Sequence, residues 1–255
     1  RRSRMLVALL AIAVGATVLS GLVTIYYDVP RQMGSQFRNY GANMIFLASS
    51  TDAVFDMSAV EDGVSFINPE ELVGVAPYRY ETVRIHEQPV VAAGTNMEGA
   101  KLTSPYWKVS GQWPQIGGDI LVGEDVADSL GLKVGDLVNV TCSVGEEEEN
   151  LLDLGMDMTV TGILDTGGSE EEYVYMAMED LEALAGNGKL DVAELSISAA
   201  SDRLNAYVDT IGANVDSISP RLVKRVTQSE SSVLKKLQAL VFLVTAVVLV
   251  LTMIC

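Results

Sequence analysis

Two long apolar runs lie at the ends of the chain. Residues 5–27 and 237–255 contain no formally charged side chain. A helix rises about 1.5 Å per residue, so about 20 apolar residues cross a hydrocarbon core of about 30 Å. We therefore predict transmembrane helices at 5–27 and 237–255. A cleaved signal peptide is the alternative for the first run, but the apolar region of such a signal is only about 7–15 residues long.

Short elements of mixed type are predicted directly after the first apolar run. Apolar residues at helical spacing predict an amphipathic helix at 31–39, ended by Gly41. The apolar hexapeptide NMIFLA predicts a strand at 43–48. Residues 49–65 show little periodicity, which predicts an exposed loop.

Proline and alternation patterns define the next part of the chain. Asn68 followed by Pro69 and two glutamates predicts the start of a short helix that Pro77 ends. The alternating pattern of residues 78–96 predicts two strands joined near residues 86–88.

The stretch GDILVGEDVADSLGLKVGDLVNV, residues 118–140, is rich in glycine and acidic residues. Local chemistry explains both without a ligand: Gly131 ends a helix in the left-handed conformation, and Asp136 braces a turn. The predicted elements are strands at 120–122 and 137–140 and a helix at 124–130.

The remaining elements complete an α+β pattern. Strands are predicted at 159–164, 173–178 and 193–199, helices at 179–186 and from a cap at Ser201, and a long helix from Pro220 into the second apolar run.

The charged residues are segregated from the apolar runs. The chain has 255 residues and a net charge of −17, and residues 28–236 hold all 34 acidic residues but only 14 of the 17 basic ones. Arg1, Arg2 and Arg4 precede the first run, so the positive-inside rule places the N-terminus in the cytoplasm and residues 28–236 outside. This acidity also disfavours nucleic acid as a partner.

Candidate catalytic chemistry is sparse. His86 is the single histidine, so no histidine-based metal cluster or second histidine partner exists. The loop GNGK at 186–189 lacks the first glycine and the final Ser or Thr of a phosphate loop. Cys142 and Cys255 support no disulfide framework. We therefore expect no enzyme activity, no catalytic or cofactor-binding residue, and no cofactor.

Two patterns invite a metal and are better explained otherwise. The run EEEE at 146–149 favours a solvated loop over a cation site. Strand alternation explains Met176 and Met178, which together with Met156 and Met158 are the candidates for a soft-metal site. We therefore expect no metal ligand.

An ordered set of segments resembles the MacB/FtsX-type permeases of ABC transporters. These segments are RRSRMLVALLAIAVGATVLSGL, YGANMIFL, YWKVSGQWP, DILVGEDVADSLGLKVGDLVNV, MTVTGIL and YVYMAMEDLEAL. The resemblance covers nearly the whole chain. It implies an N-terminal fragment of a permease with four spans in the bacterial cytoplasmic membrane.

The resemblance also implies an architecture. Residues 28–236 would form an α+β extracytoplasmic core domain, in which 40–104 and 195–226 make a membrane-proximal α/β subdomain and 105–194 an inserted, mainly β subdomain. The expected partners are an ABC ATPase subunit, a second permease copy in a homo- or heterodimer, and an extracytoplasmic adaptor or hydrolase. The long helix would transmit ATP-driven motion outward.

Other functions remain open at this stage. A chemoreceptor or sensor kinase shares the plan of a span, an outer domain and a second span. An FtsX-like regulator of cell-wall hydrolases is a further possibility within the family. Residues 118–140 mark the small outer subdomain, where a partner protein is expected to dock.

Overall fold

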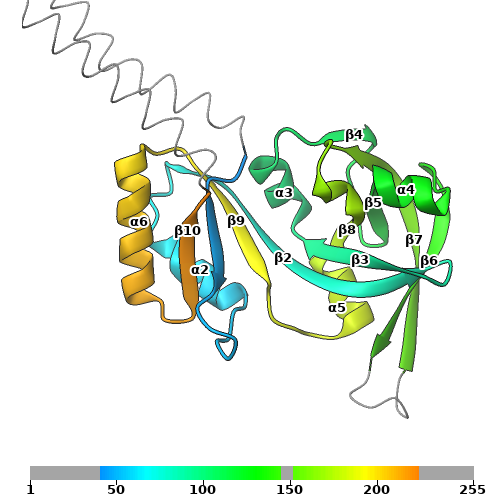
Figure 1. Ribbon diagram of the computed structural model, residues 1–255, viewed down its shortest axis with the longest axis horizontal. Helices are drawn as coiled ribbons and strands as arrows, with labels where there is room; N and C mark the ends of the chain where they lie inside the picture. The colour runs from blue at the N-terminus through cyan, green and yellow to red at the C-terminus, as the bar shows by residue number, and fades with distance from the viewer. Residues whose placement is uncertain (1–40, 145–151, 224–255) are drawn as a thin grey trace, which may run out of the picture. The chain divides into compact units, whose positions relative to one another are not determined.

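The computed structural model describes residues 41–144 and 152–223 (Figure 1). Both predicted transmembrane helices, the predicted helix at 31–39 and the acidic run at 146–149 lie outside these residues. Among the helices in the described part of the chain, none is long and apolar enough to cross a membrane.

A single mixed sheet of ten strands forms the framework. Nine strands follow the order β10-β1-β9-β2-β3-β8-β5-β7-β4, and β6 pairs with β2 and β7. Most neighbouring strands are antiparallel, whereas β3 and β8 are parallel, as are β5 and β7. The strands are β1 Met44–Ala48, β2 Leu72–Ile85, β3 Gln88–Thr95, β4 Lys108–Gly111, β5 Asp119–Gly123, β6 Leu137–Val144, β7 Leu152–Asp165, β8 Tyr173–Ala177, β9 Val192–Ile197 and β10 Ile218–Leu222.

Short helices cover the sheet in separate places. They are α2 Met57–Ser65, α3 Met97–Thr103, α4 Glu124–Leu130, the 3₁₀ helix η3 Ser169–Glu172, α5 Met178–Ala185 and α6 Ser201–Asn214. Helices α2 and α6 lie beside β1 and β10, and α4 and α5 lie with the strands at the other end of the sheet (Figure 1). The buried face of α6 carries Leu204, Tyr207 and Ile211, as its spacing predicts.

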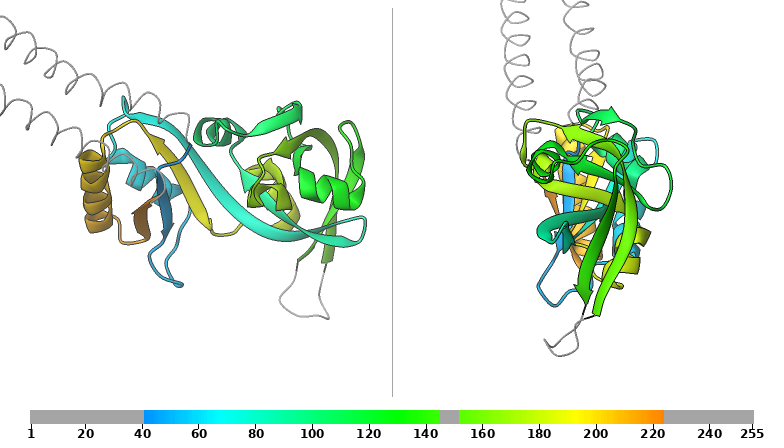
Figure 2. Two further views of the ribbon diagram at one scale, coloured as in Figure 1. Left: turned by 45° about the horizontal axis from the view of Figure 1, so that its top comes forward. Right: turned by 90° about the vertical axis from the view of Figure 1, so that its right-hand side faces the viewer.

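Three hydrophobic clusters form the core. The first lies among β5, β6, β7, β8, α4 and α5, and the second among β1, β9, β10, α2 and α6. The third, smaller cluster contains residues of β2, β3, β8 and α3. The long curved strand β2 pairs with β9 through its first half and with β6 near its end (Figure 2). The division at 40–104, 105–194 and 195–226 stays a prediction.

The structure confirms several predicted elements. The strand predicted at 43–48 is β1, and the hairpin predicted near 86–88 joins β2 to β3. Its two loop residues, His86 and Glu87, both have positive φ, at 51° and 63°. Positive φ at both loop positions is the geometry of a type I′ turn, which matches the twist of the flanking strands.

The stretch 118–140 folds as its local chemistry predicts. It forms β5, then α4, then the start of β6. Gly131 follows α4 with φ 68° and ψ 28°, the left-handed conformation. The Lys133 N–H donates to Asp136 Oδ2 at 2.8 Å, which is the predicted turn brace.

We expect Gly131→Ala to lower the free energy of unfolding by about 1 kcal/mol, because an L-residue in the left-handed conformation is strained. A Cβ at this position would meet no atom within 4 Å, so no steric clash adds to this strain. Chemical denaturation of the full chain measures it. Gly131→Asn is the control, since Asn tolerates this conformation, and equal losses for Ala and Asn would contradict the explanation.

Two predictions in the first half of the domain are wrong. Residues 57–65, predicted as loop, form α2, whose N-cap Asp56 accepts a hydrogen bond from the Ala59 N–H at 3.0 Å. Asn68 starts only a turn rather than a helix, because β2 begins at Leu72 and runs through Pro77. Pro77 is tolerated there because the pairing with β3 begins one residue later, at Tyr78.

Two predictions in the last part of the domain also need correction. Pro220 lies within strand β10, so no helix begins there. Because β10 pairs with β1 and ends the strand order, a proline without an N–H is accommodated in it. Ser201 is the first residue of α6, and the N-cap is Ala200. The rest of the predicted long helix lies outside the described residues.

Candidate functional site

The sequence candidates for chemistry are dispersed through the fold. His86 is exposed in the β2–β3 turn. Met158 and Met176 are fully buried in the first hydrophobic cluster, against which Met156 packs. Met178 begins α5. Strand alternation and core packing account for Met156, Met158 and Met176, and Met178 packs against the second hydrophobic cluster.

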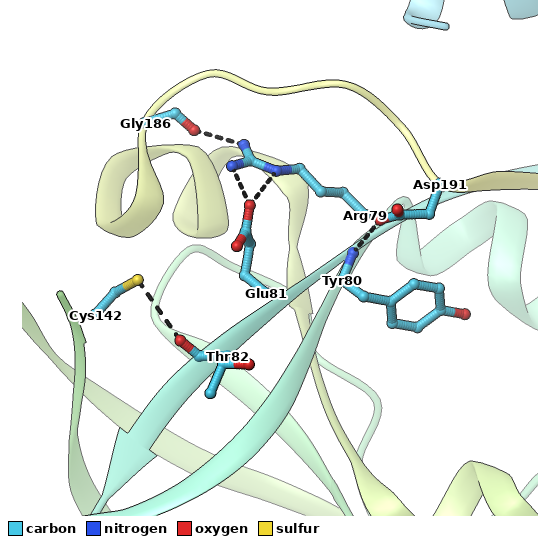
Figure 3. A network of polar contacts seen from close by, with 7 residues as sticks. All are labelled: Arg79, Tyr80, Glu81, Thr82, Cys142, Gly186 and Asp191. Atoms are coloured by element: carbon cyan, nitrogen blue, oxygen red, sulfur yellow. Dashed lines mark hydrogen bonds and ion pairs between the residues drawn. The ribbon is translucent and has the colours of Figure 1, made fainter. Parts of the chain in front are cut away.

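The GNGK loop encloses a buried arginine. Arg79 is 5% exposed, and its Nη1 donates to the carbonyl oxygen of Gly186. Its Nε and Nη2 donate to Glu81 Oε1 at 3.1 and 2.6 Å (Figure 3). A Cβ at Gly188 would lie 2.5 Å from the guanidinium carbon, so the glycine makes room for Arg79. The loop glycines thus serve packing and an ion pair.

Two further contacts hold β2 to its surroundings in the same region (Figure 3). The Tyr80 N–H donates to Asp191 Oδ2 at 2.7 Å, and the buried Cys142 thiol donates to the Thr82 carbonyl oxygen at 3.8 Å. These contacts connect β2 to the loop before β9 and to β6. They explain Cys142 as a structural side chain.

An aromatic cluster lies on the face of β2 opposite to Arg79 and Glu81. It consists of Tyr78 and Tyr80 of β2, Tyr173 and Tyr175 of β8, and Trp107 and Trp113 beside β4. The ring centroids of Tyr80 and Tyr173 are 5.4 Å apart, and those of Trp107 and Tyr175 are 4.7 Å apart. Contacts of this kind stabilise a core beyond simple burial.

A half-buried carboxylate accompanies the aromatic cluster. Glu194 of β9 pairs in register with Ala76 of β2. Burial, followed by repulsion from Glu170, raises the pKa of Glu194 to about 7. Burial, reinforced by the negative charge of Glu194, also raises the pKa of Tyr80 above its usual range. Sequence analysis missed Glu194, since a single glutamate in a strand carries no local signal.

Three carboxylates meet between α4 and η3. One oxygen from each of Glu124, Asp165 and Glu171 lies within 4.8 Å of the others. Repulsion from Asp165 raises the pKa of Glu124. Glu171 accepts hydrogen bonds from the backbone N–H groups of Thr166 and Gly167, which lower its pKa. Glu171 is the buried member of the group, and its role is to stabilise the loop at 166–168 through these hydrogen bonds.

A family model described as the MacB-like periplasmic core domain matches residues 5–228. The chain belongs to this family. A comparison with curated proteins found no match.

Two solved structures from transporters are similar to this chain. The periplasmic region of MacB from Actinobacillus actinomycetemcomitans has 9% sequence identity and a TM-score of 0.51, with 76% of this chain and 94% of that chain covered. The extracellular domain of the ABC-type transporter YknZ from Gram-positive bacteria has 13% identity and a TM-score of 0.47, with 71% and 99% covered. The described part of the chain is a mixed α/β domain with the fold of the periplasmic region of MacB.

Proposed function

We propose that the chain is part of the permease subunit of an ABC transporter and couples ATP hydrolysis on a partner ATPase to movement of the extracytoplasmic domain. The observation that carries the proposal is the family match, which extends from residue 5 through the domain to residue 228. This match favours a permease over a chemoreceptor or sensor kinase. Export of a substrate and mechanical regulation of an extracytoplasmic partner both use such coupling.

The proposed arrangement places the N-terminus in the cytoplasm and the acidic domain outside the cytoplasmic membrane. Arg1, Arg2 and Arg4 before the apolar run support this orientation. A second permease copy and an ATPase subunit would complete the complex. Because β10 ends at Leu222, the segment that transmits motion would begin after the described domain rather than at Pro220.

The test is a proline substitution in this segment. The experiment uses the complex of the full permease with its ATPase. A fluorophore on Asp209→Cys in each of two permease copies reports movement of the exposed face of α6. Cys255 is replaced by Ser to prevent labelling there, and Cys142 is buried. We expect ATP to change the energy transfer between them. Val233→Pro should abolish the change, because a proline inside a helix costs about 3 kcal/mol and kinks it.

Val233→Ala is the matched control and should retain the ATP-dependent change. An unchanged response in Val233→Pro would refute transmission through this segment. If ATP causes no change in the unsubstituted complex, coupled movement of the domain is refuted as well.

A further inference from the structure

A hollow of about 520 Å³ opens where two parallel strands end. Thr95 ends β3 and Ala177 ends β8, and both residues line it. The first turns of α3 and α5 and the loop before β5 form its other walls. Ligands of sheet proteins are commonly bound at the carboxyl ends of parallel strands.

A second hollow, of about 220 Å³, extends the first. Met57, Met178 and Glu182 line both hollows, so the two adjoin along α2 and α5. We call the combined feature the methionine groove, defined by Met57, Met97, Ile116, Met178, Glu179 and Glu182.

The groove exposes large apolar side chains. Ile116 is 72% exposed and Met57 is 45% exposed, although both are apolar. Unbranched methionine side chains adapt to different partners and are frequent at surfaces that bind varied peptides. Exposed apolar side chains gathered at a hollow indicate a binding surface.

The charge of the groove is negative. Glu98, Glu179 and Glu182 line the larger hollow and Asp56 the smaller one, and none of the described Lys or Arg residues lines either. Glu98 is paired with Lys101 at 2.7 Å, and Asp56 caps α2. Glu98 and Glu179 also favour the first turns of α3 and α5 electrostatically.

Glu182 has no such structural role. It lies in the second turn of α5, is half-buried, and makes no ion pair within residues 41–144 and 152–223. It is also the carboxylate common to both hollows. A half-buried carboxylate that shares both hollows with the exposed Met57 is complementary to an amine or guanidinium flanked by apolar side chains.

We propose that the methionine groove binds a short peptide segment that carries Lys or Arg together with large apolar side chains. The basic side chains reach Glu179 and Glu182, and the apolar side chains pack on Met57 and Ile116. Binding at the groove does not depend on ATP coupling. Its failure would therefore leave the proposed permease function untouched.

The experiment measures binding of synthetic peptides to the full chain in a neutral detergent. The probe is a fluorescein-labelled octapeptide of alternating Lys and Leu, followed by fluorescence anisotropy at about pH 7, with detergent alone as the blank. Companion octapeptides alternate Glu with Leu and Lys with Ser. We expect the Lys–Leu peptide to bind at least about tenfold more tightly than either companion.

Substitutions then locate the binding. We expect Glu179→Gln with Glu182→Gln to weaken binding about tenfold, and Met57→Ser with Ile116→Ser to weaken it similarly. Glu61→Gln with Asp209→Asn is the charge-matched control at exposed positions of α2 and α6, and should change the dissociation constant less than about twofold. Thermal unfolding verifies that each variant is folded.

Two results would overturn the proposal. Equal weakening by the groove pair and the control pair would show that the peptide responds only to the overall negative charge. Equal binding of the Lys–Ser and Lys–Leu peptides would show a site for cations rather than for an amphipathic peptide.

Discussion

Glu194→Gln is expected to stabilise the domain by about 3 kcal/mol at about pH 8 and by almost nothing at about pH 4. Burial raises the pKa of Glu194 from 4.5 to about 7, so the folded state holds the proton more tightly than the unfolded state. The stability from the protonated carboxyl is fully present below the unfolded pKa of 4.5. It is lost as the pH rises through about 7, where a partly buried carboxyl group must become charged.

Denaturant unfolding of the full chain at several pH values measures this effect. Between about pH 5 and pH 8, the free energy of unfolding of the variant should lack the pH dependence that Glu194 causes, because the amide does not ionise. Glu61→Gln removes an exposed carboxylate of α2 and should change stability by less than about 0.5 kcal/mol at any of these pH values. A gain that is the same at pH 5 and pH 8 would assign the effect of Glu194→Gln to packing rather than to charge.

Local turn chemistry made the stretch 118–140 predictable. Gly131 and Asp136 act on backbone groups only a few residues away, so the sequence contains the whole explanation of the β5-α4-β6 unit. The β2–β3 hairpin is similar, because alternation on both sides of a short loop restricts its register. The structure of such segments can be predicted from their own residues, without knowledge of the rest of the fold.

Prolines were harder to interpret because their tolerance depends on distant strands. The sequence pattern predicts a helix boundary at Pro77 and at Pro220, yet each lies within a strand. Pro77 lies one residue before the pairing of β2 with β3 begins, and Pro220 lies in β10, which is terminal in the strand order. The N–H that each proline lacks is therefore not required for strand pairing. Helix α2 was missed for a related reason: its buried residues, Ala59, Val60 and Gly63, are too few and small to give a clear periodic pattern.

The surroundings of Glu194 depend on pairing between segments far apart in sequence. Alternation places Tyr78 with Tyr80, and Tyr173 with Tyr175, on one face of each strand. That the two pairs meet follows from the parallel register of β3 with β8, in which Ala93 lies opposite Tyr175. Nothing local specifies this register. The methionine groove has the same origin, because its walls come from separate segments joined by that sheet.

The ion pair inside the GNGK loop gives the second large effect. Glu81→Met is expected to destabilise the domain by about 3 kcal/mol, because it leaves a buried guanidinium without its carboxylate. The Arg79 side chain is 6% exposed, whereas that of Glu81 is 36% exposed. Arg79→Met should therefore cost less, about 1–2 kcal/mol, since the Glu81 carboxylate that remains reaches water.

The double variant decides whether the buried charge is the cause. Arg79→Met with Glu81→Met removes both charges and should be more stable than Glu81→Met alone, because no uncompensated guanidinium remains. Denaturant unfolding at neutral pH gives the three differences. If the double variant is the least stable of the three, packing of the Arg79 guanidinium against Gly188, rather than pairing with Glu81, maintains the loop. The glycines of GNGK would then be required by the arginine's volume and not by its charge.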